Sequence, residues 1–498
     1  MSDGPGQPRV PFTEKLALGV GGLSAFFGAA GISILAYPVY NMLLGVSATT
    51  VGLALMIPRI WDAFSDPIMG RISDNFASRW GRRRPFVILG AIAMGLSFVA
   101  IWHVPQHWSE SWKVGYFIAS QLVFFTAFTV FSVPFAALSY EMTPDYKERN
   151  SVMAYLAFFH KCGEFLAGWM IPLAVVLSVY LVSQQMPDAA EESGDSAELN
   201  AQGIRGMAWI IGTVVLVGLG MLPGLFVKER YAEQAKTQKK VGILSSMRGA
   251  ATSMPFVILV AVIVLNTMAG VLASSIDQYL LVYFMYDGST SDGLVQKAIL
   301  SSGYAVVGFL SIPVMTYIAN RLGKKRALFV VYGLTVVGGI AKWFIFTPGR
   351  DTLTIGPTQF DPVLMIDPML CGPMWVAVKI LLASMMADIC DEDELKHGLR
   401  REGMFAAVFS WLEKCVVSAA FFGTGLALGL SGFDVALGAE QSEATFTKMR
   451  LFLAGAPALT ALLAIAALAF YPITADSAAE TRRQLDLRHQ QKPETPSP

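Results

Sequence analysis

Arg59-Ile-Trp-Asp62-Ala-Phe-Ser-Asp66-Pro67 places three charged side chains within an apolar segment of the chain. Asp62 and Asp66 are four residues apart, and Arg59 precedes Asp62 by three, so on an α-helix all three share nearly one face. An ionised carboxylate in hydrocarbon is costly and persists mainly where it faces a cavity, a partner or an ion. The stretch therefore predicts a membrane helix that carries a cation or proton site.

Composition agrees with a membrane protein. The 498 residues are 54% hydrophobic and 15% charged, and the mean hydropathy of +0.52 is too high for an ordinary soluble protein of this size. The formal net charge is zero, so no nucleic-acid partner is indicated. There is no Walker A or HExxH motif, and the four cysteines lack metal-ligand spacing. ATP-driven transport, enzymatic activity and an organic cofactor are therefore not expected.

About twelve apolar segments are long enough, at roughly 20 residues or more, to cross a bilayer as helices. They predict an all-α membrane protein with twelve transmembrane helices. Lys and Arg gather in alternate loops, which predicts a multi-pass protein of the plasma membrane, of bacterial inner-membrane type, with both termini cytoplasmic. The segments are 16–45, 49–69, 86–104, 113–139, 150–182, 207–227, 254–285, 294–319, 327–347, 363–387, 404–430 and 449–473.

The chain also looks doubled. Ser78-Arg-Trp-Gly-Arg-Arg-Arg84 follows the second segment, and Asn320-Arg-Leu-Gly-Lys-Lys-Arg326 follows the eighth. Equivalent loops six segments apart predict two six-helix halves that rock around a site at the membrane midplane, as in secondary transporters. The predicted divisions are a cytoplasmic tail 1–15, an N-terminal half 16–227, a central cytoplasmic loop 228–253, a C-terminal half 254–473 and a cytoplasmic tail 474–498.

Asp62 and Asp66 supply hard oxygen ligands that suit Na⁺, or they hold a proton instead. Two alternatives are a structural ion pair with Arg59 and, for Asp66, a helix end at the membrane surface. Lys414 lies within the eleventh segment and needs a counter-charge. The aspartates across the bundle are the expected partners, and snorkelling to one surface is the alternative. A lysine that competes with the cation would couple cation occupancy to conformation.

Further intramembrane charges are candidates for the substrate site. Lys161 and Glu164 are helical neighbours, which either satisfy each other or line a substrate cavity. Lys379 is followed by eight uncharged residues, which favours a pocket position. Asp277 fits the outer surface or the pocket equally well. Lys342 is near the outer end of its segment, and snorkelling is expected there.

Charged residues at the cytoplasmic ends of the helices predict a gate. Basic side chains there can pair with helix C-terminal carbonyls and with acids of the other half, such as Asp388 or Asp391. The alternative is that the basic residues only fix the topology. The predicted gate residues are Asp74, Arg79, Arg82, Glu141, Arg149, Asp388 and Asp391.

With these residues in view, the chain resembles the glycoside–pentoside–hexuronide:cation symporter family of the major facilitator superfamily, the melibiose permease-like transporters. The resemblance spans nearly the whole chain and is carried by the second-helix stretch quoted above, by Ser78-Arg-Trp-Gly-Arg-Arg-Arg-Pro85, by Ala387-Asp-Ile-Cys-Asp391 and by Lys414. It implies that Asp62 and Asp66 bind the coupling cation, that Lys414 lies beside them, and that Asp62 is nearest to both cation and substrate.

The chain departs from this family at the sugar site. Phe26 stands where the resemblance places a sugar-binding Asp, and Ala157 stands in place of an Arg. Ser132 stands in place of a fourth-helix acid and is a candidate neutral cation ligand. Lys379 replaces an aromatic residue of the pocket. A galactoside site is therefore not reproduced, since lost hydroxyl partners cost discrimination heavily. Animal lysolipid symporters look like distant relatives that keep the Asp pair and the Lys, so the scaffold does not fix the substrate.

The sequence thus predicts a monomeric secondary transporter that moves a small organic solute by Na⁺- or H⁺-coupled symport. The expected solute is a sugar, glycoside or uronide, and the basic pair Lys161 and Lys379 makes an acidic sugar a reasonable case. The alternative solute is a lysolipid or another amphiphile. A membrane sensor or enzyme subunit is a third interpretation. The predicted substrate contacts are Asp62, Phe26, Lys161, Glu164, Lys379 and Asp277.

Overall fold

The computed structural model describes residues 9–76, 78–143, 146–185, 200–229, 252–355, 358–397 and 402–491. The expectations for residues 1–8, for most of the central loop 228–253 and for the end of the C-terminal tail lie outside these ranges.

The N-terminal half comprises α1 (Phe12–Ala36), η1 (Tyr37–Leu43), α2 (Ala48–Asn75), α3 (Arg84–Ile101), α4 (Glu110–Tyr140), α5 (Tyr146–Gly168), α6 (Met170–Gln185), α8 (Ala201–Ile210), η2 (Ile211–Leu219) and α9 (Gly220–Phe226).

The C-terminal half is also helical, with one small addition. Its helices are α11 (Met254–Tyr279), η4 (Leu280–Met285), α12 (Thr290–Leu322), α13 (Lys324–Ile345), η5 (Pro362–Met365), α14 (Ile366–His397), α15 (Glu402–Ser431), η6 (Val435–Leu437), α16 (Glu443–Ala469) and α17 (Ala475–Gln491). Between α13 and α14, β1 (Leu353–Ile355) pairs antiparallel with β2 (Thr358–Phe360), and Leu353 lies opposite Phe360. The all-helical prediction holds apart from this hairpin.

Within the described ranges, ten helices are long and apolar enough to cross a bilayer. α5 and α6 meet at a bend of 49° and together form an eleventh candidate span. α2 is too polar to be counted with them, because its charged residues lower its hydropathy. Its 28 residues nevertheless extend about 42 Å, and it packs along α4 and α15 inside the bundle. We therefore assign α2 as a further span, which gives the twelve expected from the sequence.

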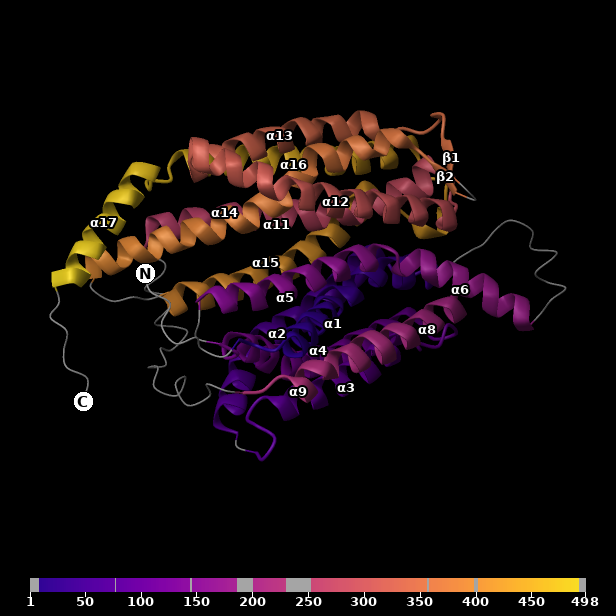
Figure 1. Ribbon diagram of the computed structural model, residues 1–498. Coiled ribbons are helices and arrows are strands. Elements are labelled where there is room, and N and C mark those ends of the chain that lie inside the picture. The colour runs from indigo at the N-terminus through magenta and orange to yellow at the C-terminus, as the bar shows by residue number, and fades with distance from the viewer. Residues whose placement is uncertain are drawn as a thin grey trace.

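The two halves lie as two layers along a shared boundary (Figure 1). α2 packs against α15, and α5 against α12, so each half contributes helices to this boundary. α17 lies at one end of the molecule, which we call the tail end, and β1 and β2 lie at the opposite end, which we call the hairpin end (Figure 1). The ends of α1 and α11, and the beginning of α2, lie on the hairpin side.

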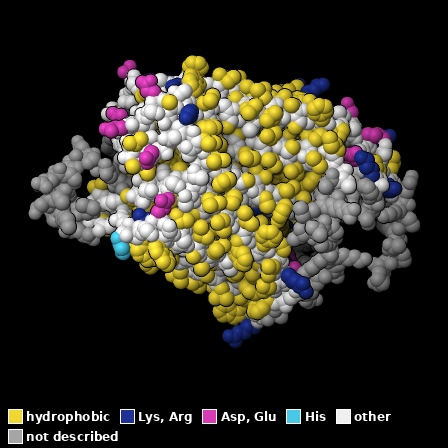
Figure 2. All heavy atoms as spheres, turned by 180° about the vertical axis from the view of Figure 1, so that it is seen from behind, with side chains coloured by type: hydrophobic (Ala, Val, Ile, Leu, Met, Phe, Trp, Pro, Cys, Tyr) yellow, Lys and Arg dark blue, Asp and Glu magenta, His cyan; other side chains and the backbone are white. Residues whose placement is uncertain are grey.

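The outside of the bundle is apolar. Figure 2 shows a broad hydrophobic face, with charged side chains gathered toward its edges. Large apolar side chains are exposed on this surface, for example Phe64 (60% exposed), Phe309 (60%) and Leu430 (63%). Water would make so large an apolar surface unfavourable, whereas lipid tails accept it. The molecule is therefore built to lie in a bilayer.

Hydrogen bonds join the two halves near the hairpin end. Tyr279 of α11 donates its hydroxyl to Asn41 Oδ1 at 2.7 Å, and both residues are buried. Tyr37 donates its hydroxyl to the Phe421 carbonyl of α15 at 3.1 Å. Because each bond links the N-terminal half to the C-terminal half, these contacts close the boundary at this end.

A close approach of α2 and α15 completes this closure. Thr49 Oγ1 donates to the Gly425 carbonyl at 3.0 Å, and a Cβ added to Gly425 would lie 2.5 Å from the Ala48 carbonyl oxygen. A backbone atom cannot move aside as a flexible side chain can, so a glycine is required for the helices to meet here. Gly423, on the same helix, has no atom within 4 Å of such a Cβ.

Gly425→Val is expected to open the hairpin end, because overpacking of this kind costs about 1–3 kcal/mol and shifts the conformational equilibrium by roughly ten-fold. The measurement is the alkylation rate of a reporter Ser33→Cys, whose side chain lines a cavity between the two halves, by an impermeant reagent added on the membrane side to which the hairpin end faces. Native cysteines are removed in this background. Gly423→Val is the matched control and should label slowly. Equal labelling rates for the two variants would contradict the assignment of this contact as the closure.

Candidate functional site

α2, α4 and α15 bring four side chains together inside the bundle. Lys414 Nζ lies 2.9 Å from Asp62 Oδ2 and makes a still closer ion pair with Asp66 Oδ2. Thr129 Oγ1 lies 3.0 Å from Asp62 Oδ1 and 3.2 Å from Asp66 Oδ1. Asp62 is fully buried, whereas 28% of the Asp66 side chain and 25% of the Lys414 side chain are exposed. One carboxylate is therefore sealed in the bundle and the other is accessible.

The helical spacing explains this geometry. Asp62 and Asp66 are one turn apart, so both carboxylates face α15, and Lys414 reaches them across the boundary between the halves. Arg59 is engaged elsewhere: it donates to the Ala29 carbonyl of α1, and its guanidinium lies 4.5 Å from the centre of the Phe125 ring. Lys414, rather than Arg59, is thus the ion-pair partner of the aspartates.

Thr129 is a site residue that sequence reasoning missed. Ser132 was the predicted hydroxyl ligand on α4, but the hydroxyl within hydrogen-bond distance of both carboxylates belongs to Thr129, one turn earlier. Both residues are hydroxyl-bearing members of the same apolar segment. The choice between them depends on how α4 rotates against α2, which no local sequence pattern specifies.

The site has two carboxyl groups and one ammonium. Two ionised carboxylates and one ammonium leave one negative charge, so a monovalent cation or a proton brings the site to neutrality. Burial makes such neutrality important, because an uncompensated charge away from water is strongly unfavourable. Within the described ranges, no three His, Cys, Asp or Glu side chains are placed to hold a metal ion together, and this site offers two carboxylates with a hydroxyl.

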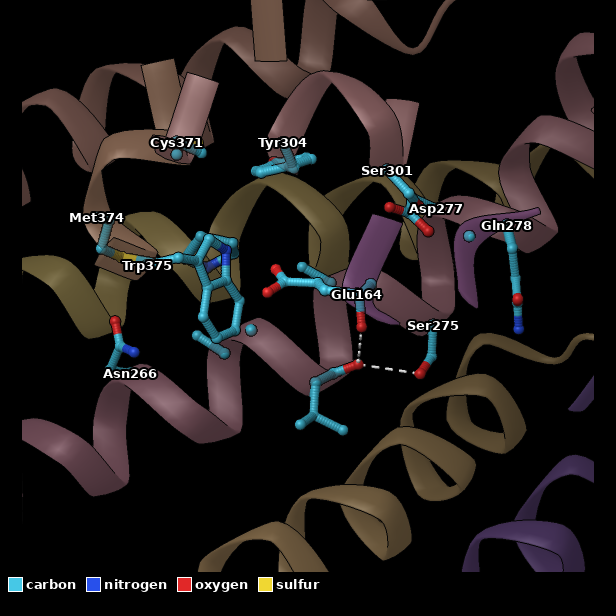
Figure 3. Close-up of a pocket in the computed structure, with 18 of the residues that line it drawn as sticks. Glu164, Asn266, Ser275, Asp277, Gln278, Ser301, Tyr304, Cys371, Met374 and Trp375 are labelled. Atoms are coloured by element: carbon cyan, nitrogen blue, oxygen red, sulfur yellow. Dashed lines mark hydrogen bonds between the residues drawn. The ribbon is translucent and has the colours of Figure 1, made fainter. Parts of the chain in front are cut away.

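A cavity of about 390 Å³ lies between the halves. Four of the predicted substrate residues line it: Phe26, Lys161, Glu164 and Asp277. Figure 3 shows Glu164, Asp277, Tyr304 and Trp375 around it. Asp62 and Lys379 are not among the described residues of its wall. Lys379 is instead exposed on α14, one turn beyond Trp375.

The N-terminal half contributes one wall of the cavity. Lys161 Nζ and Glu164 Oε2 form an ion pair at 2.6 Å, so these helical neighbours satisfy each other and also line the cavity. The Phe26 ring packs edge-on against His160, with centroids 5.0 Å apart. Lys161 and Glu164 were expected either to satisfy each other or to line a substrate cavity, and in the structure they do both.

The C-terminal half contributes two ion pairs, one partly buried and one fully buried. Asp277 pairs with Lys297 at 2.6 Å, which places Asp277 in the cavity wall rather than on the outer surface. Lys342 pairs with Asp367 at 2.5 Å, and its side chain is only 3% exposed. The prediction that Lys342 snorkels is therefore wrong, because a buried carboxylate holds it inside. Lys297 and Asp367 were missed because they lie near the beginnings of their helices, where charge is usually on the surface.

A cluster of charges lies at the tail end of the N-terminal half. Arg82 and Arg83 each place Nη2 2.9 Å from Glu141 Oε1, and Arg83 also reaches Asp74 at 3.3 Å. Glu229 accepts hydrogen bonds from the backbone N–H groups of Arg82 and Arg83. Burial raises the pKa of Glu141 above its usual range, against the opposing effect of Arg83 and Arg82. Three predicted gate residues, Asp74, Arg82 and Glu141, are thus in one cluster.

The other predicted gate residues do not bridge the halves as expected. Asp388 pairs with Lys324 of its own half at 2.6 Å, and Asp391 lies 3.8 Å from Arg482 of α17. Arg149 donates to the Thr143 carbonyl at 3.4 Å, and Arg79 is exposed. The physical reason is the conformation: the contacts that join the halves lie toward the hairpin end, so acids at the tail end find partners within their own half.

Residues 17–475 match the family described as MFS/sugar transport protein. The chain belongs to this family. This finding confirms the resemblance drawn from the second-helix stretch and the loop motifs, and it identifies the protein as a multi-pass membrane transporter rather than an enzyme. Several similar proteins carry the names of symporters.

Three relatives span nearly the whole chain. The chain is 27% identical to an uncharacterized symporter of Synechocystis sp., with 98% of this chain and 99% of that protein aligned. It is 22% identical to the isoprimeverose transporter of Lactiplantibacillus pentosus, over 87% of this chain and 83% of that protein. It is 23% identical to the sodium-dependent lysophosphatidylcholine symporter 1 of Gallus gallus, over 97% and 90% respectively. Solutes among the relatives thus range from a glycoside to a lysolipid.

Solved structures support the fold. A crystal structure of a bacterial homolog of the human lysosomal transporter Spinster, in an inward-facing and unoccupied conformation, aligns with a TM-score of 0.63. The alignment covers 95% of this chain and 97% of that one, at 15% identity. The major facilitator fold, which the family resemblance implied and the doubled loops agreed with, is therefore confirmed.

Thr129→Val is expected to weaken cation binding on the order of ten-fold, because a hydrogen bond to a charged group contributes about 1.5–3 kcal/mol. The measurement is the Na⁺ or H⁺ concentration that half-saturates the thermal stabilisation of the purified protein. Ser132→Ala, one turn away on α4, is the matched control and should leave this concentration unchanged. A shift in the Ser132 variant alone would show that the hydroxyl at 132 serves the site.

Proposed function

We propose that this protein is a secondary active transporter that couples the movement of a small organic solute to Na⁺ or H⁺ by alternating access. Asp62 and Asp66 bind the coupling cation, Thr129 supports both carboxylates, and Lys414 replaces the cation when the site is empty. The observation that carries this proposal is the ion pair of Lys414 with both aspartates. An ammonium and a cation compete for the same oxygens, so occupancy by one releases the other.

The position of this ion pair supports the coupling mechanism. Lys414 belongs to the C-terminal half and the two aspartates belong to the N-terminal half, so the pair bridges the boundary that moves in alternating access. A cation that takes the place of Lys414 removes this bridge. The strength of the interface between the halves therefore depends on cation occupancy.

α15 connects the cation site to the cavity and to the closed end. Phe421 follows Lys414 by seven residues, which is two turns and about 10 Å along the same face of the helix. Phe421 lines the cavity, and its carbonyl accepts the hydrogen bond from Tyr37. A displacement of α15 at Lys414 is therefore transmitted to the solute cavity and to the hairpin end by one rigid element.

The cavity supports a sugar, glycoside or uronide as the solute. Its wall combines amide and hydroxyl groups with an aromatic ring, for example Asn266, Thr335 and Trp375. Such a combination suits the hydroxyl groups and the apolar face of a sugar ring. The alternative is a lysolipid or other amphiphile, for which Phe26, Phe421 and the name of the Gallus gallus relative are the supporting observations.

The distribution of basic loops supports a cytoplasmic tail end, with both termini on that side of a plasma membrane. In that orientation the closed hairpin end faces outward, so this conformation receives the coupling cation and solute from, or releases them to, the cytoplasm. We propose that the transporting unit is a monomer, since one chain supplies both carboxylates, the lysine and the cavity.

Asp62→Asn is expected to abolish cation-driven accumulation of solute, because it removes one charge from the site while keeping its shape. The measurement is uptake into right-side-out vesicles with a panel of sugars, glycosides, uronides and lysolipids, under a Na⁺ or proton gradient. Exchange of solute without a gradient should partly remain. Asp476→Asn, which alters an exposed carboxylate of α17, is the control. Accumulation that survives Asp62→Asn would remove Asp62 from the coupling site.

A further inference from the structure

The wall of the solute cavity carries more ammonium groups than carboxylates. Its lysines are Lys161, Lys297 and Lys342, and its carboxylates are Glu164 and Asp277. Lys161 and Glu164 neutralise each other within one helix turn. The other two lysines belong to the C-terminal half, where Lys297 pairs with Asp277 of the same wall and Lys342 pairs with Asp367.

Lys297 is held by a single carboxylate that also faces the cavity. Its Nζ lies 2.6 and 2.7 Å from the two oxygens of Asp277, and it donates to the Ser274 carbonyl at 3.0 Å. Asp277 and Lys297 both line the cavity, so an entering anion meets this pair from the cavity side. A solute carboxylate that takes the place of Asp277 would restore the same contacts to Lys297.

Lys342 has hydrogen-bonding capacity left over. Its Nζ donates to Asp367 Oδ2 at 2.5 Å and to Tyr304 Oη at the long distance of 3.4 Å, and an ammonium has three protons. Lys342 lines the cavity, whereas Asp367 is not among the described residues of the wall. Asp277, Lys297 and Lys342 line the same cavity, so one solute can reach both ion pairs.

Two other buried groups in the same half have no hydrogen-bond partner in the part of the chain that the structure describes. Asn266 Oδ1 and Tyr332 Oη line the cavity, and neither has a hydrogen-bond partner among the described residues. Both residues are buried, with exposures of 6% and 1%. Leaving such groups unpaired is costly, so they mark places where a solute supplies hydroxyl groups. Figure 3 shows Asn266 and Asp277 on the walls of one cavity, with Trp375 between them in this view.

We infer that Lys297 and Lys342 form an anion subsite in the C-terminal half, which binds a carboxylate group of the transported solute. Asp277 pairs with Lys297 when the cavity holds no solute, and the solute carboxylate displaces Asp277 when the solute enters. Asn266 and Tyr332 bind the hydroxyl-bearing part. This inference rests on the proposed transport function and selects acidic solutes over neutral ones of the same shape.

A purely structural role for the two ion pairs makes a different prediction. If Asp277 and Lys297 only brace α11 against α12, removing either charge leaves the other buried and unpaired, and both single variants lose function alike. If the two residues form an anion subsite, the two substitutions shift the preference for an acidic solute in opposite directions. Lys297→Gln removes the binding group, whereas Asp277→Asn removes the competitor of the solute carboxylate.

The experiment compares the affinities of the purified full-length protein for methyl β-D-glucuronide and methyl β-D-glucoside by calorimetry. The native protein is expected to prefer the acid on the order of ten-fold, as charge-assisted hydrogen bonds allow. Lys297→Gln should lower this ratio several-fold, and Asp277→Asn should raise it. The double variant has no unpaired charge at these positions, so it should keep the native melting temperature and still have the lowered ratio.

Lys324→Gln and Asp388→Asn provide the matched control. This pair has the same chemistry and the same separation of 2.6 Å, but it lies at the tail end outside the cavity wall, so its removal should leave the affinity ratio unchanged. No preference for the acid in the native protein would overturn the inference, as would parallel losses for both ligands in Lys297→Gln and Asp277→Asn. Retained accumulation that depends on Asp62 in those cases would show that the transport function stands without this subsite.

Discussion

Carboxylates inside a membrane-spanning bundle must be neutralised, and this requirement dominates the molecule. Asp62 is fully buried, Asp66 is partly so, and Lys414 reaches both from the opposite half. The contact is therefore a local ion pair and also part of the interface between the halves. Its free energy depends on which positive charge occupies the site, so the same interaction serves both binding and conformational change.

The other membrane-embedded ion pairs have a different character. Lys161 with Glu164, and Asp277 with Lys297, each join residues of one half. Breaking such a pair does not separate the halves, so it can respond to a solute without directly changing the closure at the hairpin end. An ion pair that joins the two halves thus suits coupling to a cation. Ion pairs within one half suit recognition of the solute in the cavity.

Closure at the hairpin end is built from neutral contacts instead. Tyr279 with Asn41 and Tyr37 with the Phe421 carbonyl are single hydrogen bonds, and Gly425 lets two backbones meet. Neutral hydrogen bonds of this kind stabilise by about 1 kcal/mol each, so the free energy of cation binding is enough to break a few of them reversibly. Strong ion pairs at this position would hold the halves in one state.

Much of this protein could be read from the chain alone. Apolar segments of membrane length gave the helices, repeated basic loops gave the two halves, and the four-residue spacing of Asp62 and Asp66 put both on one helix face. The partner Lys414 was also predictable, because an intramembrane ammonium requires a carboxylate. These inferences follow from the cost of exposing apolar surface to water and charge to lipid, which acts on any chain whatever its neighbours.

The remaining features depended on packing between helices. Thr129 rather than Ser132 meets the carboxylates because of the rotation of α4 against α2. Lys342 is held inside because Asp367, distant in sequence, lies against it. Asp388 pairs with Lys324 rather than across the boundary because the halves join near the hairpin end. Hydropathy and spacing fix which residues must find partners, whereas the three-dimensional arrangement of helices selects which partners they find.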